Sequence, residues 1–235
     1  QKPMILTSGT LAVGEDFHRF KEAAGLLTDS RVRESVSPSP FAYSRSCLMY
    51  VSRLPAHQEA GQYYDRLTGE IAALVDAAHG HALVLFTSYA AMSAVKERLR
   101  EQDLAYPLFT LGRNAVHTTK QFKNTPGGVL LATGAAWEGF DFPGDCVSLL
   151  VIPRLPFPIP NALKEKEREQ YPTLHSFLRG VVVPEMQIKL KQGFGRAIRL
   201  ETDTCVVAIL DERAARNQRY WKDVLAALPE MPVTQ

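Results

Sequence analysis

The sequence lacks most of the features that would assign a function directly. Its 235 residues contain only three cysteines, which are too widely spaced for a disulfide framework or a metal-ligand pattern. The six histidines complete no metal-binding motif with them. No apolar run approaches the roughly 18 residues of a membrane span, and no signal peptide opens the chain. These absences argue against a disulfide-rich secreted domain, a metal enzyme and a membrane partner, and they favour a reducing, cytoplasmic compartment.

Net charge is also small. The formal charge of +2 is too low for general attraction to nucleic acid, so any basic surface must be local. A hydrophobic content of 46% and a charged content of 22% are typical of an ordinary globular protein. The length suffices for one large domain, which we expect to span residues 1–235. Because the chain opens at Gln1 and enters an apolar stretch at once, we expect it to be part of a longer polypeptide.

Short apolar runs alternate with amphipathic segments along most of the chain. The predicted strands are residues 4–7, 48–52, 82–86, 107–111, 128–132, 147–152 and 204–210. The predicted helices are residues 16–25, 58–79, 91–101, 116–124 and 214–228. This alternation predicts an α/β fold with a mainly parallel sheet and helices on both faces. In such sheets ligands bind at the carboxyl ends of the strands.

Residues 153–184 interrupt this alternation. The stretch is rich in proline and contains a run of charges that alternate in sign at residues 164–169. Alternating charges are typical of an exposed helix rather than of a nucleic-acid grip. We therefore expect a surface excursion within the single domain.

Two segments near predicted strand ends carry hydroxyl groups. In residues 6–11, Ser8 and Thr10 flank a glycine and could bond phosphate or relay a change between domains, although an ordinary turn would look the same. In the second segment, Ser88 follows a buried strand at the start of a helix, where free backbone N–H groups can bind phosphate. Tyr89 could stack on a base. The alternative for this second segment is a helix cap followed by a packed tyrosine.

A third segment, residues 133–142, combines two glycines with two carboxylates just after a buried strand. Asp141 could hold a ribose hydroxyl, and Gly139 would let a nucleotide approach the backbone. A purely structural loop is the alternative interpretation.

The fourth segment is residues 192–199. If it is helical, the 100° step per residue places Gln192, Arg196 and Arg199 within about 60° of one another. Arginine suits phosphate binding because its planar fork stays charged and makes paired hydrogen bonds. The residues expected on the opposite, buried side are Leu190, Phe194 and Ala197. The alternative is a solvated basic face.

Two glycines in this fourth segment weaken that alternative. Gly193 and Gly195 would each cost about 1 kcal/mol in a helix interior relative to alanine. We therefore expect another group to approach the backbone closely at this point.

Together, and in this order, the four segments resemble motifs III, IV, V and VI of superfamily 2 helicases. The resemblance is to the second RecA-like, three-layer motor domain of the DinG/XPD (Rad3-related) branch, on its bacterial DinG/YoaA side. Residues 155–158 and 191–196 carry the bacterial likeness, and residues 210–213 match the strand end that follows motif VI.

The resemblance implies an ATP-driven DNA helicase that moves 5′ to 3′. It assigns Arg196 and Arg199 as arginine fingers and Gln192 as a group that places the phosphate or the attacking water. The remaining implied roles are nucleotide binding for Glu138, Gly139 and Asp141, DNA binding for Ser88, Tyr89, Thr133 and Gly134, and coupling for Ser8 and Thr10. The implied partners are single-stranded or forked DNA and the N-terminal motor domain of the same polypeptide.

Two other motifs of such helicases are missing from this sequence. It has no G-x-x-x-x-G-K-[ST] phosphate loop and no Asp-Glu-x-His box for Mg²⁺. The resemblance therefore implies that ATP and Mg²⁺ bind mainly to the first motor domain, which would also hold the family's iron–sulfur cluster. We expect this chain alone neither to hydrolyse ATP nor to unwind DNA. A stand-alone nucleic-acid-binding module and half of an RNA helicase are the alternatives.

Overall fold

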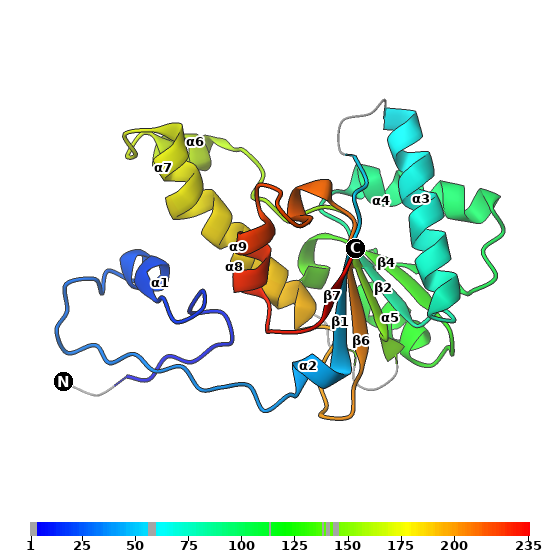
Figure 1. Ribbon diagram of the computed structural model, residues 1–235, viewed down its shortest axis with the longest axis horizontal. Helices are drawn as coiled ribbons and strands as arrows, with labels where there is room; N and C mark the ends of the chain where they lie inside the picture. Colours follow the sequence, from blue (N-terminus) through cyan, green and yellow to red (C-terminus); the bar gives the residue numbers. More distant parts are fainter. Residues whose placement is uncertain (1–3, 56–59, 113, 138, 140–141, 143–145) are drawn as a thin grey trace.

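The computed structural model describes residues 4–55, 60–112, 114–137, 139, 142 and 146–235 (Figure 1). Within these residues, seven strands form one sheet in the order β3-β4-β2-β5-β6-β1-β7. Every neighbouring pair is parallel. The strands are β1 Cys47–Val51, β2 Ala82–Leu85, β3 Leu108–Thr110, β4 Val129–Ala132, β5 Leu149–Ile152, β6 Cys205–Ile209 and β7 Val233–Thr234. The predicted parallel α/β sheet is confirmed.

The sheet lies between two layers of helices. All four residues of β2, of β4 and of β5 are buried, as expected of continuous apolar strands covered on both faces. Side chains of α3 (Ala60–Ala77) and α4 (Tyr89–Glu101) pack on one face. Side chains of α5 (Ala115–Lys123), α8 (Val183–Phe194) and α9 (Trp221–Ala227) pack on the other. The domain thus has three layers, with one hydrophobic core on each face of the sheet.

The excursion after β5 consists of short helices that lead into α8. They are α6 (Ala162–Arg168), α7 (Leu174–Phe177) and the π-helical turn η3 (Leu178–Val182). Helix α6 buries no residue, whereas Phe177 and Val181 are buried. The excursion is thus solvated at its start and packed at its end.

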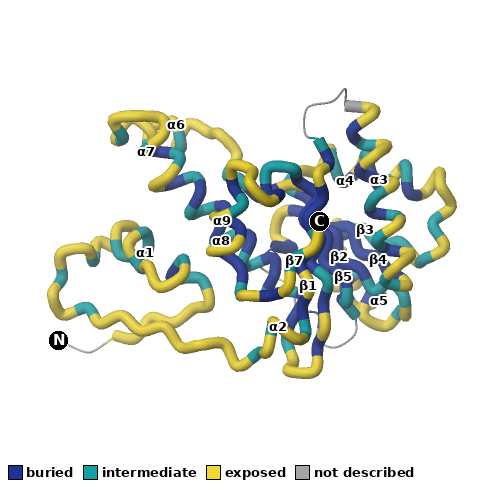
Figure 2. The backbone as a smooth tube through the Cα atoms, in the orientation of Figure 1, coloured by how far each residue is buried: buried dark blue, intermediate teal, exposed yellow. Residues whose placement is uncertain are grey.

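The chain before β1 is largely exposed and runs out to one side of the sheet (Figures 1 and 2). It contains α1 (His18–Ala23) and α2 (Tyr43–Ser46). Arg19 of α1 forms ion pairs with Glu167 of α6 at 2.8 Å and with Glu185 of α8 at 2.7 Å. Lys164 of α6 pairs with both carboxylates as well. This network attaches the N-terminal segment to the excursion.

Several predicted elements are wrong in part. Residues 4–7 form no strand, because no described strand pairs with them, and Ile5 is 90% exposed. The predicted helix 16–25 is reduced to α1, and the predicted helix 214–228 is divided into the 3-10 turn η4 (Glu212–Ala214) and α9. Strand β7 was not predicted, and it extends the sheet beside β1.

Candidate functional site

The loop after β2 presents a serine and a tyrosine. Ser88 is the N-cap of α4, and its Oγ accepts a hydrogen bond from the backbone N–H of Ala91 at 3.2 Å. The cap interpretation of Ser88 is therefore confirmed. Tyr89 is not packed, since 67% of it is exposed. A tyrosine ring exposed at the carboxyl end of a buried strand is free to stack on a ligand.

The loop after β4 lies beside this tyrosine. Thr133 is 6% exposed, and its hydroxyl donates to the carbonyl of Phe86 at 2.9 Å. Gly134 has a φ of +62°, and a Cβ built on it would lie 3.7 Å from the Tyr89 hydroxyl. Tyr89 and Gly134 therefore lie on one exposed surface. The buried Thr133 holds the loop to the end of β2 through its hydrogen bond to Phe86. The predicted DNA contact of Thr133 stays a prediction.

Trp137 joins three of the four predicted segments. It ends the 3-10 turn η1 (Gly134–Trp137) and is fully buried. Its indole N–H donates to the same Phe86 carbonyl at 2.9 Å. Its ring also lies against Gly193 of α8. We call these four residues, Phe86, Thr133, Trp137 and Gly193, the Trp137 junction.

The predicted close approach at the glycine pair is confirmed at Gly193. A Cβ built there would lie 2.7 Å from Cζ3 and 2.8 Å from Cε3 of Trp137. The approaching group is thus a core side chain rather than a ligand. Gly195 differs, because a Cβ there would make only ordinary contacts at 3.5 Å.

The predicted helical face of Gln192, Arg196 and Arg199 is wrong. Helix α8 ends at Phe194, with Gly195 as its C-cap, so both arginines lie beyond the helix. The Nε of Arg196 donates to the carbonyl of Gln192 at 3.2 Å, which turns this side chain back toward the helix end. The three residues predicted to be buried, Leu190, Phe194 and Ala197, are buried.

Asp203 organises the backbone after these arginines. It is 4% exposed, and its Oδ2 accepts hydrogen bonds from the N–H groups of Arg199 and Leu200, both at 2.8 Å. Sequence reasoning missed this residue. The available signal was an aspartate, a common turn residue, in the short connection between the arginine segment and β6.

A second buried aspartate lies at the end of β6. Asp211 accepts a bidentate pair of hydrogen bonds from Arg213 and one from the backbone N–H of Leu155 at 2.9 Å. Burial alone would raise the pKa of Asp211, but these hydrogen bonds outweigh burial and lower it. The carboxylate thereby joins the ends of β5 and β6.

The remaining predicted residues are those that follow Trp137 in the sequence and those that precede α1. Glu138 and Asp141 lie outside the described residues, whereas Gly139 is exposed and donates to the carbonyl of Ala135 at 2.9 Å. Ser8 and Thr10 contact each other through their hydroxyls at 3.2 Å. They precede α1 in the segment that extends away from the sheet (Figure 1).

The described residues contain no group of three or more metal-ligating side chains. In the same part of the chain, no helix combines the length and apolarity needed to cross a bilayer.

The fold is that of a RecA-like helicase domain. A solved XPD helicase superimposes with a TM-score of 0.62 at 19% identity, over 80% of this chain and 36% of that one. The sequence profile described as "Helicase C-terminal domain" matches residues 71–231. The chain belongs to this helicase C-terminal domain family.

The curated relatives agree with the predicted branch. The ATP-dependent DNA helicase YoaA of Escherichia coli is 34% identical over 100% of this chain and 37% of its own length. The ATP-dependent helicase DinG of Mycobacterium tuberculosis is 35% identical over 96% of this chain and 34% of its own length. The chain thus spans about a third of these relatives, and its resemblance to DinG/YoaA-type helicases is confirmed.

Proposed function

We propose that this chain is the second motor domain of an ATP-dependent DNA helicase that moves 5′ to 3′ on single-stranded or forked DNA. The observation that carries the proposal is the Trp137 junction. It connects the loop with Tyr89, the loop with Gly134 and the helix that leads to Arg196. A change at the arginines could thereby reach the surface proposed for DNA.

On the nucleotide side, Arg196 and Arg199 would act as arginine fingers, and Gln192 would help to place the phosphate or the attacking water. Fingers of this kind stabilise the charge of the transition state and are worth about 10³–10⁵ in rate. Asp203 supports this role because it fixes the backbone at Arg199. Gly139, with Glu138 and Asp141 outside the described residues, would border the nucleotide.

The other motor domain of the same polypeptide would supply the rest of the site. The described residues offer no cluster of carboxylates for Mg²⁺, so the metal would be held there together with ATP. An iron–sulfur cluster, where the intact protein has one, would also belong to that domain. Hydrolysis would then require both domains in contact.

The N-terminal segment provides a surface for that contact. Met4, Ile5 and Leu6 are exposed by 81%, 90% and 51%, although their sequence is that of a buried strand. An exposed apolar run followed by Ser8 and Thr10 suits an inter-domain boundary that couples the nucleotide state to DNA.

On the DNA side, Tyr89 and Gly134 form the exposed part of the proposed surface. Tyr89 would stack on a base, and the backbone around Ser88 and Gly134 would approach phosphates. Thr133 would contribute by holding its loop against Phe86. Such contacts are largely independent of sequence and sensitive to salt.

The test uses the intact polypeptide with Arg196→Ala or Arg199→Ala. We expect DNA-stimulated ATP hydrolysis to be lost while DNA binding survives, with the exposed Arg100→Ala as the matched control. Equal loss of both activities would instead show a folding role for the arginines. This chain alone, assayed for phosphate release with single-stranded DNA, should show no turnover above background.

A further inference from the structure

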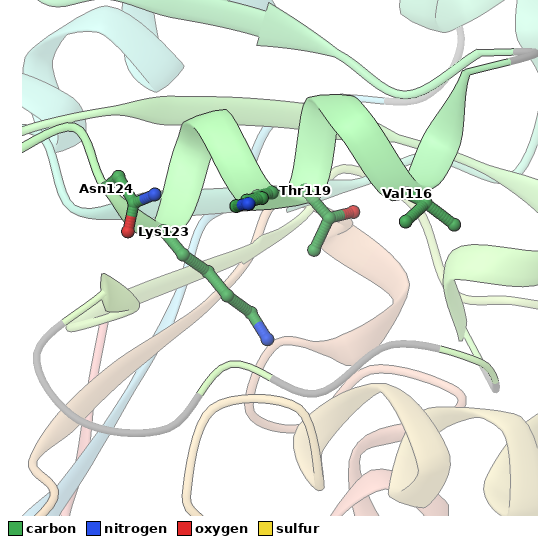
Figure 3. A pocket seen from close by; sticks show the side chains of 5 residues that line it. Val116, Thr119, Lys123 and Asn124 are labelled. Atoms are coloured by element: carbon green, nitrogen blue, oxygen red, sulfur yellow. The ribbon is translucent and has the colours of Figure 1, made fainter.

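A pocket of about 360 Å³ lies along α5, outside the residues assigned above (Figure 3). Its lining residues are Val116, Thr119, Lys120, Lys123 and Asn124. Residues four apart lie one above the other on a helix surface. Val116, Lys120 and Asn124 therefore form one row along α5, and Thr119 and Lys123 form the row beside it. Figure 3 shows the side chains of Val116, Thr119 and Lys123 extending to the same side of α5.

The pocket contains a buried hydroxyl that is not satisfied within the described residues. Thr119 is 7% exposed, and its Oγ1 has no hydrogen-bond partner among them. A threonine in a helix can usually donate to a carbonyl of the preceding turn. Thr119 lines the pocket, and its buried hydroxyl would gain a hydrogen-bond partner from a ligand bound there.

The charged groups of the pocket are all positive. Lys120 and Lys123 are exposed, and neither takes part in an ion pair among the described residues. The ammonium of Lys123 lies 5.7 Å from the centre of the Phe142 ring, and this cation–π contact orients it. Asn124 adds an amide that can donate. The pocket thus combines two ammonium groups with a hydroxyl and an amide.

We propose that this pocket binds a phosphodiester group of single-stranded nucleic acid. The proposal rests on the proposed helicase function and extends the DNA surface from the strand ends to the flank of α5. A phosphodiester shares one negative charge between two non-bridging oxygens, which accept hydrogen bonds from lysine, threonine and asparagine side chains. The exposed methyl groups of Val116 would face the sugar.

The decisive variant is Lys120→Gln with Lys123→Gln in the intact protein. Binding of a fluorescent oligothymidylate is followed by anisotropy over a series of salt concentrations. The slope of log Kd against log salt should fall by about 0.7, because one phosphate is no longer neutralised. The matched control is Arg100→Gln with Lys222→Gln, which removes the same charge from exposed positions elsewhere.

Thr119→Val tests the contribution of the buried hydroxyl to binding separately from that of the two lysine charges. This nearly isosteric change should weaken binding by about three- to tenfold without lowering the melting temperature. Unchanged binding in the Thr119 variant would overturn the role of the hydroxyl.

The outcomes also separate this inference from the proposed function. If the unmodified protein binds the oligonucleotide and the lysine variant behaves like its control, the pocket is overturned and the helicase assignment stands. If the unmodified protein fails to bind single-stranded DNA, both are overturned.

Discussion

The indole ring of Trp137 lies directly against the backbone of Gly193, so that a Cβ at position 193 would approach ring carbons to 2.7 and 2.8 Å. Real Cβ atoms do not come this close to an aromatic ring, and the buried Trp137 has little room to move. The glycine is therefore required by the contact between α8 and the loop after β4.

Gly193→Ala should destabilise the chain for this reason. Alanine would favour the helix by about 1 kcal/mol, but overpacking against Trp137 and Leu85 costs about 1–3 kcal/mol. We expect a net loss of up to about 2 kcal/mol in the free energy of unfolding, measured by chemical denaturation.

Gly195→Ala is the matched control, since its φ of −61° suits alanine and a Cβ would make only ordinary contacts there. We expect no loss, or a gain of up to about 1 kcal/mol. Equal destabilisation at both positions would contradict a specific contact between Gly193 and Trp137.

Asp203→Ala tests the support of the arginine segment. Removing the carboxylate leaves the N–H groups of Arg199 and Leu200 without their acceptor, which should cost about 1–3 kcal/mol in the free energy of unfolding. In the intact protein we also expect slower ATP hydrolysis, because the backbone at Arg199 is no longer fixed. Asp203→Asn retains an oxygen acceptor and should recover most of both losses. Full ATPase activity in the alanine variant would show that the position of Arg199 does not depend on Asp203.

The fold could be predicted largely from sequence. Most predicted strands agree with the structure to within one or two residues, because strands buried on both faces are continuous apolar runs. Residues 4–7 have the same apolar pattern and form no strand. Strand formation requires a partner, and the apolar pattern alone does not reveal whether one is present.

The candidate site could be predicted less completely. The strand-end loops with Ser88 and Gly134 follow from the rule that ligands bind at carboxyl ends. The end of α8 at Phe194 could not be predicted from the sequence, because two glycines stand close together there. Gly193 lies within the helix, whereas Gly195 is its C-cap. The packing of Trp137 explains only why position 193 is a glycine, and that contact exists only in the folded chain. Asp203 and Lys123 were missed because the former resembles a turn residue and the latter a solvated lysine.

The lowered pKa of Asp211 predicts that the free energy of unfolding depends on pH. Its pKa is lower in the folded chain than the ordinary value of 3.8, so the carboxylate stabilises the fold above that value. The contribution is lost as the pH falls through the folded pKa. Asp211→Asn should therefore cost about 2–3 kcal/mol near neutral pH, with a difference from the unmodified chain that shrinks below about pH 4. A difference that is constant from pH 7 to about pH 3 would contradict this role.

The three cysteines should differ in reactivity. The cysteines are far apart in sequence, but the fold places Cys47 opposite Cys205 in the β1–β6 register, with both thiols free. Burial raises the pKa of both thiols, so neither should form thiolate near neutral pH. Only the half-buried Cys146 should react quickly with a disulfide reagent in the native chain. Cys146→Ser should abolish the fast phase, and two fast thiols in the unmodified chain would contradict this assignment.

Tyr89 offers the sharpest test of the proposed DNA surface. The residue is 67% exposed and its hydroxyl lies beside Gly134, so removal of the side chain should leave the core intact. Stacking of one base on an aromatic ring is worth about 1–3 kcal/mol, so Tyr89→Ala should weaken single-stranded DNA binding by the intact protein about 5- to 160-fold. Tyr89→Phe retains the ring and should bind nearly as well as the unmodified protein. If Tyr89→Phe loses as much affinity as Tyr89→Ala, the hydroxyl rather than the ring makes the contact. If neither variant loses affinity, DNA does not pass over this strand end.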